Sequence, residues 1–178
     1  MKRQENLELV SLFREEIDET EWFGYVVAEN DDFLAIHSVS DRYDLDGYRI
    51  FRTEDLDEID DEFERKDLVL RAMEFKNLEP QTIPWLSLDS IREMVLSIQA
   101  EEPLLVIERE IVSPEECEIG RVRLDSDSTY SLLWMTTQAE WERDDRVFHY
   151  EDITQISFGG EYERTLAQLA GPWPRDAA

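Results

Sequence analysis

The sequence is poor in the residues that build disulfides, metal sites and membrane spans. Its one cysteine, Cys117, excludes an intrachain disulfide, and it has only two histidines, His37 and His149. No stretch approaches the ~18 consecutive apolar residues of a transmembrane helix. Glu8 and Arg14 interrupt the first apolar segment, so we expect no secretory signal peptide. These absences predict a cytoplasmic protein without membrane contact.

Basic residues are also scarce. The chain has 18 Lys and Arg against 44 Asp and Glu, for a formal net charge of −26. Such a charge repels nucleic acid and anionic lipid, and it attracts basic proteins, metal ions or polyamines. Two alternatives are that it serves solubility alone, or that it reflects a high-salt environment. Five Trp, six Tyr and eight Phe supply the aromatic content that disordered acidic chains lack, so we expect a folded protein.

Motifs of catalytic chemistry are missing. The chain has no Gly-rich phosphate loop, no Gly-x-Ser-x-Gly element and no Cys-x-x-Cys pair. Cys117 lies between Glu116 and Glu118, whose charges disfavour a reactive thiolate. A two-histidine metal site would require His37 to meet His149, and we expect both to be structural instead. The sequence therefore predicts a protein that is not an enzyme and has no catalytic residue, metal or cofactor.

One segment matches part of a calcium-binding loop. Asp44, Asp46 and Gly47 fit positions 3, 5 and 6 of an EF-hand. Positions 1 and 12, which need oxygen ligands, hold Arg42 and Thr53. Asp46 and Gly47 are therefore predicted to form a turn.

The sequence repeats internally. Gly24 and Gly120 are 96 residues apart (120 − 24), and Glu54-Asp55 and Glu151-Asp152 are 97 apart (151 − 54). Two further matches extend the pattern, Leu9-Val10 with Leu105-Val106 and Glu62-Phe63-Glu64-Arg65 with Glu161-Tyr162-Glu163-Arg164. Because the landmarks keep their order, we predict two copies of one small unit.

Local signals within each copy favour strands and turns. The acidic segments 30–32 and 125–128 separate β-rich runs, as in hairpins. Gly24 and Gly120 interrupt strands, where glycine marks a bulge or a bend. The pattern Glu-Asp-Leu/Ile-x-x-Ile is compatible with a short 3₁₀ turn and with a bent strand.

Apolar periodicity predicts two helices. Residues 65–75 place Leu68, Val69, Ala72, Met73 and Phe75 on one broad face. Residues 88–98 carry an apolar stripe, with Ser87 or Asp89 as a cap and Ser90 and Glu93 at capping-box spacing. Two prolines in 79–85 mark a linker. We predict a first barrel-like unit with a terminal helix at 1–79, a linker with an amphipathic helix at 80–102, a second barrel-like unit at 103–172 and a loose tail at 173–178.

Part of each copy resembles a known family of small barrels. Gly24-Tyr25-Val26 and Gly120-Arg121-Val122, each followed by an acidic turn and an apolar strand, are similar to the first half of an Sm motif. The resemblance implies a mainly-β fold of two tandem Sm-like or SH3-like barrels. Sm proteins bind RNA, but the segments 41–46 and 140–145 are acidic where a basic or polar RNA-binding loop would be expected.

The remaining candidates for function are surface features. Trp134 is expected in the core, whereas Tyr43 and Trp141 are predicted to lie in charged loops and are candidate contact residues for a partner. An acidic run supplies further candidates: Glu54, Asp55, Asp57, Asp60 and Asp61. We therefore expect a non-catalytic interaction module that binds or neutralises a basic protein. The alternatives are an Sm-like RNA-binding module and a metal-dependent enzyme with carboxylates in a cleft between the units.

Overall fold

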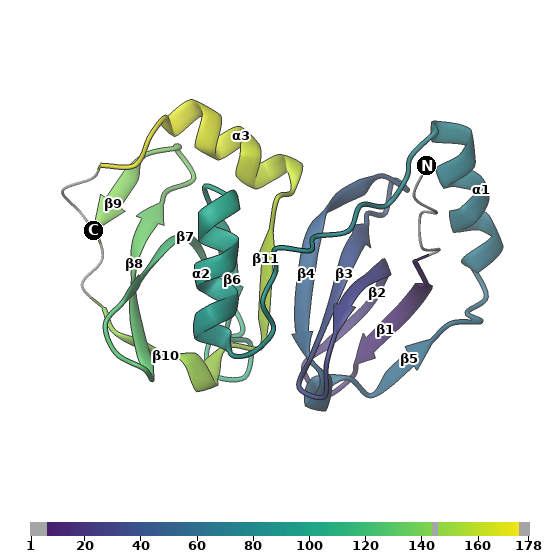
Figure 1. The fold of residues 1–178 in the computed structure, drawn as a ribbon, viewed down its shortest axis with the longest axis horizontal. Helices are drawn as coiled ribbons and strands as arrows, with labels where there is room; N and C mark the ends of the chain where they lie inside the picture. Colours follow the sequence, from purple (N-terminus) through teal and green to yellow (C-terminus); the bar gives the residue numbers. More distant parts are fainter. Residues whose placement is uncertain (1–6, 144–145, 175–178) are drawn as a thin grey trace. The chain divides into compact units, whose positions relative to one another are not determined.

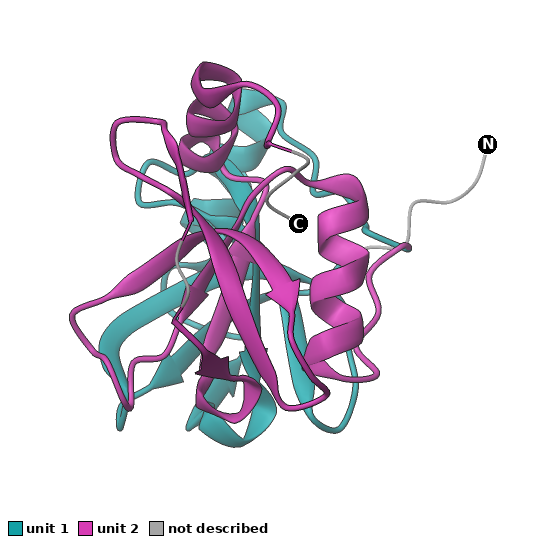
Figure 2. Ribbon diagram, turned by 90° about the vertical axis from the view of Figure 1, so that its left-hand side faces the viewer, with its two compact units in different colours: residues 1–84 teal, residues 85–178 magenta. Residues whose placement is uncertain are grey.

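The computed structural model describes residues 7–143 and 146–174 (Figure 1). The chain divides into two compact units, residues 1–84 and 85–178 (Figure 2). Of the described residues, 39% lie in strands and 23% in helices, which confirms the mainly-β prediction. In the described part of the chain, no helix combines the length and apolarity that a membrane crossing needs.

The first unit is a five-stranded antiparallel sheet with one helix. Its strands run in the order β4-β3-β2-β1-β5. Their bounds are β1 Leu9–Arg14, β2 Asp18–Glu29, β3 Phe33–Val39, β4 Leu45–Arg52 and β5 Glu58–Asp60. A short 3₁₀ helix, η1 (Thr53–Asp55), connects β4 to β5, and the helix α1 (Lys66–Lys76) follows β5.

Alternation along the strands gives this sheet two apolar faces. One face packs Leu9, Tyr25 and Val39 against Val69 and Met73 of α1. The other face includes Val10, Leu12, Leu34, Ile36 and Phe51. The predicted helical face is wrong at its margins, because Leu68 is 45% exposed and Phe75 is 90% exposed.

The second unit repeats this arrangement and adds a helix at its start. That helix, α2 (Ile91–Glu101), is capped by Ser90, whose hydroxyl accepts the Glu93 N–H at 3.2 Å. Its strands are β6 Leu105–Glu108, β7 Cys117–Leu124, β8 Thr129–Met135, β9 Trp141–Arg143, β10 Phe148–His149 and β11 Gln155–Phe158. They pair antiparallel in the order β11-β6-β7-β8, and both β9 and β10 pair with β8. The 3₁₀ helix η2 (Tyr150–Asp152) precedes β11, and α3 (Glu161–Ala170) follows it.

Side chains tie α2 to the second unit. The Gln99 side chain accepts the Val122 N–H at 2.6 Å and donates to the Val122 carbonyl at 3.1 Å. The Arg121 guanidinium donates to the carbonyls of Gln99, Glu102 and Pro103, at the end of α2 and just beyond it. The helix that was predicted within a linker is therefore fixed to β7.

The pairing leaves each sheet open. Within the described residues, no ladder joins β4 to β5 in the first unit, or β9 or β10 to β11 in the second. Two closed tandem barrels are therefore not found, and the shared feature is the mainly antiparallel five-strand order.

The two sheets nevertheless share a register. Gly24 pairs with Ser38, and Gly120 pairs with Trp134, 14 residues later in both units (38 − 24, 134 − 120). Leu12 pairs with Ile59 as Ile107 pairs with Ile156. Both units also place a 3₁₀ helix before the last strand. This agreement supports the interpretation as two copies, which stays a prediction.

Two of the sequence matches differ from the structural register. Val10, and not Leu9, pairs with the glycine of the first unit, whereas Leu105 pairs with Gly120, so the match of Leu9-Val10 to Leu105-Val106 is displaced by one residue. The match of 62–65 to 161–164 also fails, because residues 62–65 precede α1 and residues 161–164 begin α3.

Gly24 and Gly120 are required by close packing between strands. A Cβ on Gly24 would lie 2.8 Å from the His37 carbonyl oxygen, and one on Gly120 would lie 2.2 Å from the Leu133 carbonyl oxygen. The irregularities in β2 lie on either side of Gly24, one between Asp18 and Trp22 and one between Val26 and Ala28. The predicted bulge at the glycines themselves is therefore replaced by a close approach of two backbones.

Candidate partner-binding surfaces

The acidic run occupies an edge of the first sheet. Segment 54–64 begins in η1, continues through β5 and ends just before α1, and among the described strands β5 pairs with β1 alone. Exposed carboxylates belong to Glu54, Asp57, Glu58, Asp61, Glu62 and Glu64, while Asp55 and Asp60 are half-buried. Figure 1 shows β5 at the margin of its own sheet.

Arg52 and Lys66 lie beside exposed carboxylates of this acidic segment. Arg52 lies 3.6 Å from Glu54, and Lys66 lies 3.7 Å from Glu62. Glu54 and Glu62 are largely exposed, so water screens both contacts strongly and each adds little stability. A β-strand edge lined with carboxylates resists pairing with neutral strands. The same edge presents a concentrated negative charge to a basic partner.

Tyr43 belongs to a tight turn and is half-buried. Its φ of 57° is left-handed, and Ser40 closes the turn by accepting the Tyr43 N–H and donating to the Asp44 carbonyl. The ring packs against the cluster that includes Leu9 and Val69. In the second unit the same turn places Ala139 at the equivalent position, with a φ of 59°. Trp141, the aromatic candidate of the second unit, therefore lies two residues after the position equivalent to Tyr43.

Trp141 lies in strand β9, and its prediction as a loop residue is wrong. It pairs with Met135 on β8, as Leu45 pairs with Val39 in the first unit. Its ring packs against Leu104, Met135 and Leu166, and its indole N–H donates to the Gly171 carbonyl at 3.2 Å. Glu140 and Glu142 flank it and are exposed, because successive strand residues point to opposite faces.

Trp141 also lines an open groove of about 400 Å³ in the second unit. Pro103, Pro172 and Trp173 form much of its apolar wall, and Arg164 and Gln168 of α3 supply its polar groups. The Arg164 side chain is 58% exposed and lies 3.6 Å from Glu102. The volume is in the range of ordinary ligand-binding clefts.

Arg121 stacks on Trp173, which forms part of the groove wall. The Arg121 guanidinium lies 4.0 Å from the centre of the Trp173 ring. Burial lowers the pKa of Arg121, but its ordinary value is so high that the group stays charged near neutral pH. Sequence reasoning missed this groove, because its members come from a loop, a strand, a helix and the segment after it.

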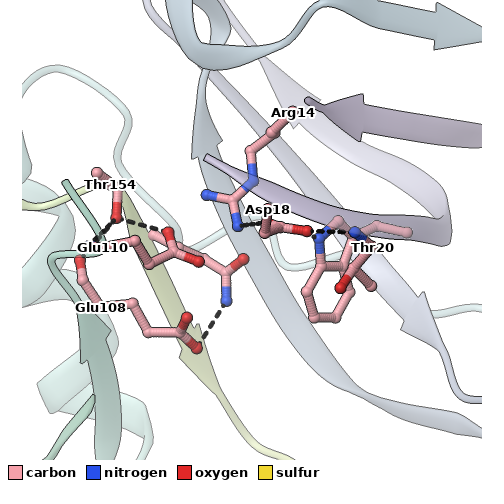
Figure 3. A network of polar contacts seen from close by, with 8 residues as sticks. Arg14, Asp18, Thr20, Glu108, Glu110 and Thr154 are labelled. Carbon is pink, nitrogen blue, oxygen red and sulfur yellow. Dashed lines mark hydrogen bonds and ion pairs between the residues drawn. The ribbon is translucent and has the colours of Figure 1, made fainter. Parts of the chain in front are cut away.

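Each unit also contains a buried arginine paired with a carboxylate. Arg14 pairs with Asp18 in the first unit (Figure 3), and Arg109 pairs with Glu118 in the second. The guanidinium of Arg14 lies 5.1 Å from the Phe51 ring, and that of Arg109 lies 4.6 Å from the Phe148 ring. Both guanidinium groups are buried, so we interpret these pairs as contributions to stability and not as an open site.

The second pair is part of a larger buried polar cluster. Tyr130 is fully buried and stacks on Phe148 and Tyr150. Burial, followed by the nearby Glu118 charge, raises the pKa of Tyr130 far above its usual range. In the same unit Thr154, the residue before β11, contacts Glu108 and Glu110 (Figure 3). The phenol therefore stays protonated and cannot act as a base.

Groups with chemical reactivity are dispersed. Partial burial and the Glu108 and Glu118 charges raise the pKa of Cys117, which keeps this exposed thiol protonated. His37 is buried in β3, whereas His149 is exposed in β10. Residues 7–143 and 146–174 contain no group of three or more His, Cys, Asp or Glu that could hold a metal ion.

Asp46 and Gly47, in the segment that partly matches a calcium-binding loop, do not form the predicted turn. Asp46 and Gly47 lie inside β4, and the turn comes earlier, at residues 40–44. Gly47 has a φ of 67°, next to an irregular register between His37 and Val39. The positive φ of Gly47 therefore accommodates an irregularity within the strand. Trp134, expected in the core, is half-buried with Arg146 over its ring at 5.1 Å.

Comparison with known proteins gives no identification. No family model, no curated protein and no solved structure matches this chain.

Proposed function

We propose that this protein is a non-catalytic interaction module that binds a basic protein through segment 54–64. The supporting observation is the run of exposed carboxylates on the edge strand β5 and its flanks. Two of these carboxylates are in ion pairs, both longer than 3.5 Å. A basic partner would gain from this concentrated charge through faster, salt-sensitive association.

The groove at Trp141, in the second unit, is a further candidate contact surface for a protein partner. Electrostatic attraction favours encounter, whereas tight binding needs a desolvated anchor such as an aromatic residue in a pocket. Trp141 and Trp173 provide aromatic surface of this kind. Because Trp141 also packs in the core, Trp173→Ala is the cleaner test of the groove, and we expect weaker binding with unchanged folding.

The decisive experiment reverses charge on segment 54–64. One variant carries Lys at five exposed positions, Glu54, Asp57, Glu58, Asp61 and Glu62. A matched control carries Lys at five exposed positions elsewhere, Glu15, Glu16, Glu19, Glu115 and Glu116. Both variants have a net charge of −16, because each replacement adds two positive charges to −26. Both are immobilised and exposed to native extract at low salt.

We expect wild type and the control to retain basic proteins that salt elutes, and the segment variant to lose them. The proteins are identified by mass spectrometry, and the affinity of each purified one is then measured against all three chains. Equal loss in both variants would show that net charge alone matters. A nucleic-acid absorbance ratio at 260/280 nm in the eluate would contradict the proposal and favour RNA binding.

A further inference from the structure

Two side chains of the first sheet hold one backbone residue of the segment after α1. The Gln81 N–H donates to Nδ1 of His37 at 3.0 Å, and the Gln81 carbonyl accepts from the Tyr48 hydroxyl at 3.3 Å. His37 and Tyr48 are direct neighbours on β3 and β4, and their rings stack with centroids 4.4 Å apart. Both polar backbone groups of Gln81 are therefore bound to neighbouring residues of two paired strands.

The contact at His37 requires one protonation state. A ring nitrogen accepts an N–H only when it carries no proton, so the proton of neutral His37 lies on Nε2. His37 is 8% exposed, which leaves little water to replace a lost partner. Protonation of Nδ1 would turn the acceptor into a donor facing the Gln81 N–H, and this hydrogen bond would be lost.

Two phenols lie beside His37, Tyr48 on β4 and Tyr25 on β2, and each pairs directly with it across the sheet. Burial raises the pKa of Tyr25, and ordinary phenols titrate near 10, well above the histidine value of about 6.5. A change at Gln81 between pH 5 and 8 would thus report on the imidazole and not on these phenols.

The position of this contact gives it a role in the fold. Gln81 lies three residues before the end of the first unit at residue 84 (84 − 81). In the second unit the position equivalent to His37 holds Leu133, which cannot accept a hydrogen bond. We propose that His37 is a pH-sensitive clasp, which fixes the end of the first unit after α1 to the first sheet near neutral pH and loosens it on protonation.

Amide hydrogen exchange of the full chain tests the clasp at the residue concerned. The protection factor of the Gln81 amide, corrected for intrinsic exchange, is measured from pH 8 to pH 5. We expect it to be constant at the upper end and to fall about tenfold with decreasing pH, the size expected for losing one hydrogen bond. The midpoint should match the titration of the His37 ring protons measured on the same sample by NMR.

Three variants define the outcome. His37→Gln keeps an acceptor that does not titrate, so its Gln81 protection should stay high at every pH. His37→Leu, which copies the second unit, should give low protection at every pH. His149→Gln removes the exposed histidine and should leave the wild-type profile unchanged.

Two results would overturn the proposal. One is a titrating His37 ring with constant Gln81 protection. The other is a loss of protection with falling pH that persists in His37→Gln. If His37→Leu fails to fold, the wild-type midpoint and the two glutamine variants still decide the question.

Discussion

Replacement of Glu118 by Ala should destabilise the second unit strongly. Glu118 is 0% exposed and Arg109 is 9% exposed, and the Arg109 Nε donates to Glu118 at 3.0 Å. This hydrogen bond raises the pKa of Arg109, and a guanidinium cannot relieve its burial by losing a proton. Removal of the carboxylate therefore leaves an uncompensated buried charge, which costs about 3–5 kcal/mol.

Urea unfolding followed by circular dichroism measures this loss, and amide exchange in β6–β8 assigns it to the second unit. Arg164, whose side chain is 58% exposed and lies 3.6 Å from Glu102, is the control, and Arg164→Gln should cost less than about 1 kcal/mol. The double variant Arg109→Met with Glu118→Leu should recover most of the stability, because it removes both charges. A Glu118→Ala loss below about 1 kcal/mol, or a double variant no better than the single one, would refute this reasoning.

Three further predictions use the same unfolding assay. Gly120→Ala should destabilise the protein more than Gly24→Ala, by roughly 1–3 kcal/mol, the usual cost of overpacking. The new Cβ at residue 120 would lie 2.2 Å from the Leu133 carbonyl oxygen, whereas the new Cβ at residue 24 would mainly meet the Ile36 side chain. Equal losses would contradict this prediction. Burial raises the pKa of Tyr130, so the folded state keeps the phenol proton while the unfolded chain loses it above about pH 10. The free energy of unfolding should therefore fall as the pH rises above this value. Tyr130→Phe should reduce this dependence of stability on pH. Phe75→Ser should change stability by less than about 0.5 kcal/mol, because the ring is 90% exposed; a larger loss would mean that it packs against the fold.

The sequence allowed prediction of the β-rich composition and the capped helix, but not of the alignment of the first strands. Leu9–Arg14 is buried at five of its six positions, and Leu105 to Ile107 are all buried. Continuous burial removes the two-residue alternation that would fix the phase of a strand. A match of Leu9-Val10 to Leu105-Val106 was therefore as good in sequence as the correct alignment one residue away.

Only the part of the candidate site that is continuous in sequence could be predicted. Segment 54–64 is continuous in sequence, so its carboxylates could be named in advance, although Asp55 and Asp60 proved half-buried. Trp141 was misplaced because flanking charges resemble a loop, whereas alternation sends Trp inward and Glu outward along β9. Arg164 and Trp173 could not be linked to Trp141 without the path of α3.

The two buried arginines occupy similar positions in the two sheets but pair with carboxylates that are not equivalent. Arg14 and Arg109 each follow the first strand's apolar run and lie over a phenylalanine of the fourth-strand region. Their carboxylates are not equivalent, since Asp18 follows Arg14 by four residues and Glu118 follows Arg109 by nine (18 − 14, 118 − 109). Local spacing lets Asp18 stay partly hydrated, with 19% of its side chain exposed, whereas Glu118 is fully enclosed.

This difference predicts unequal costs for the two pairs. Asp18→Ala should destabilise the first unit by less than Glu118→Ala destabilises the second, because water that reaches Asp18 can solvate Arg14 after the carboxylate is removed. Amide exchange in β1–β3 and in β6–β8 measures the two losses separately in the full chain. Equal losses would mean that the phenylalanine beneath each guanidinium, and not access of water to the carboxylate, sets the cost of losing that carboxylate.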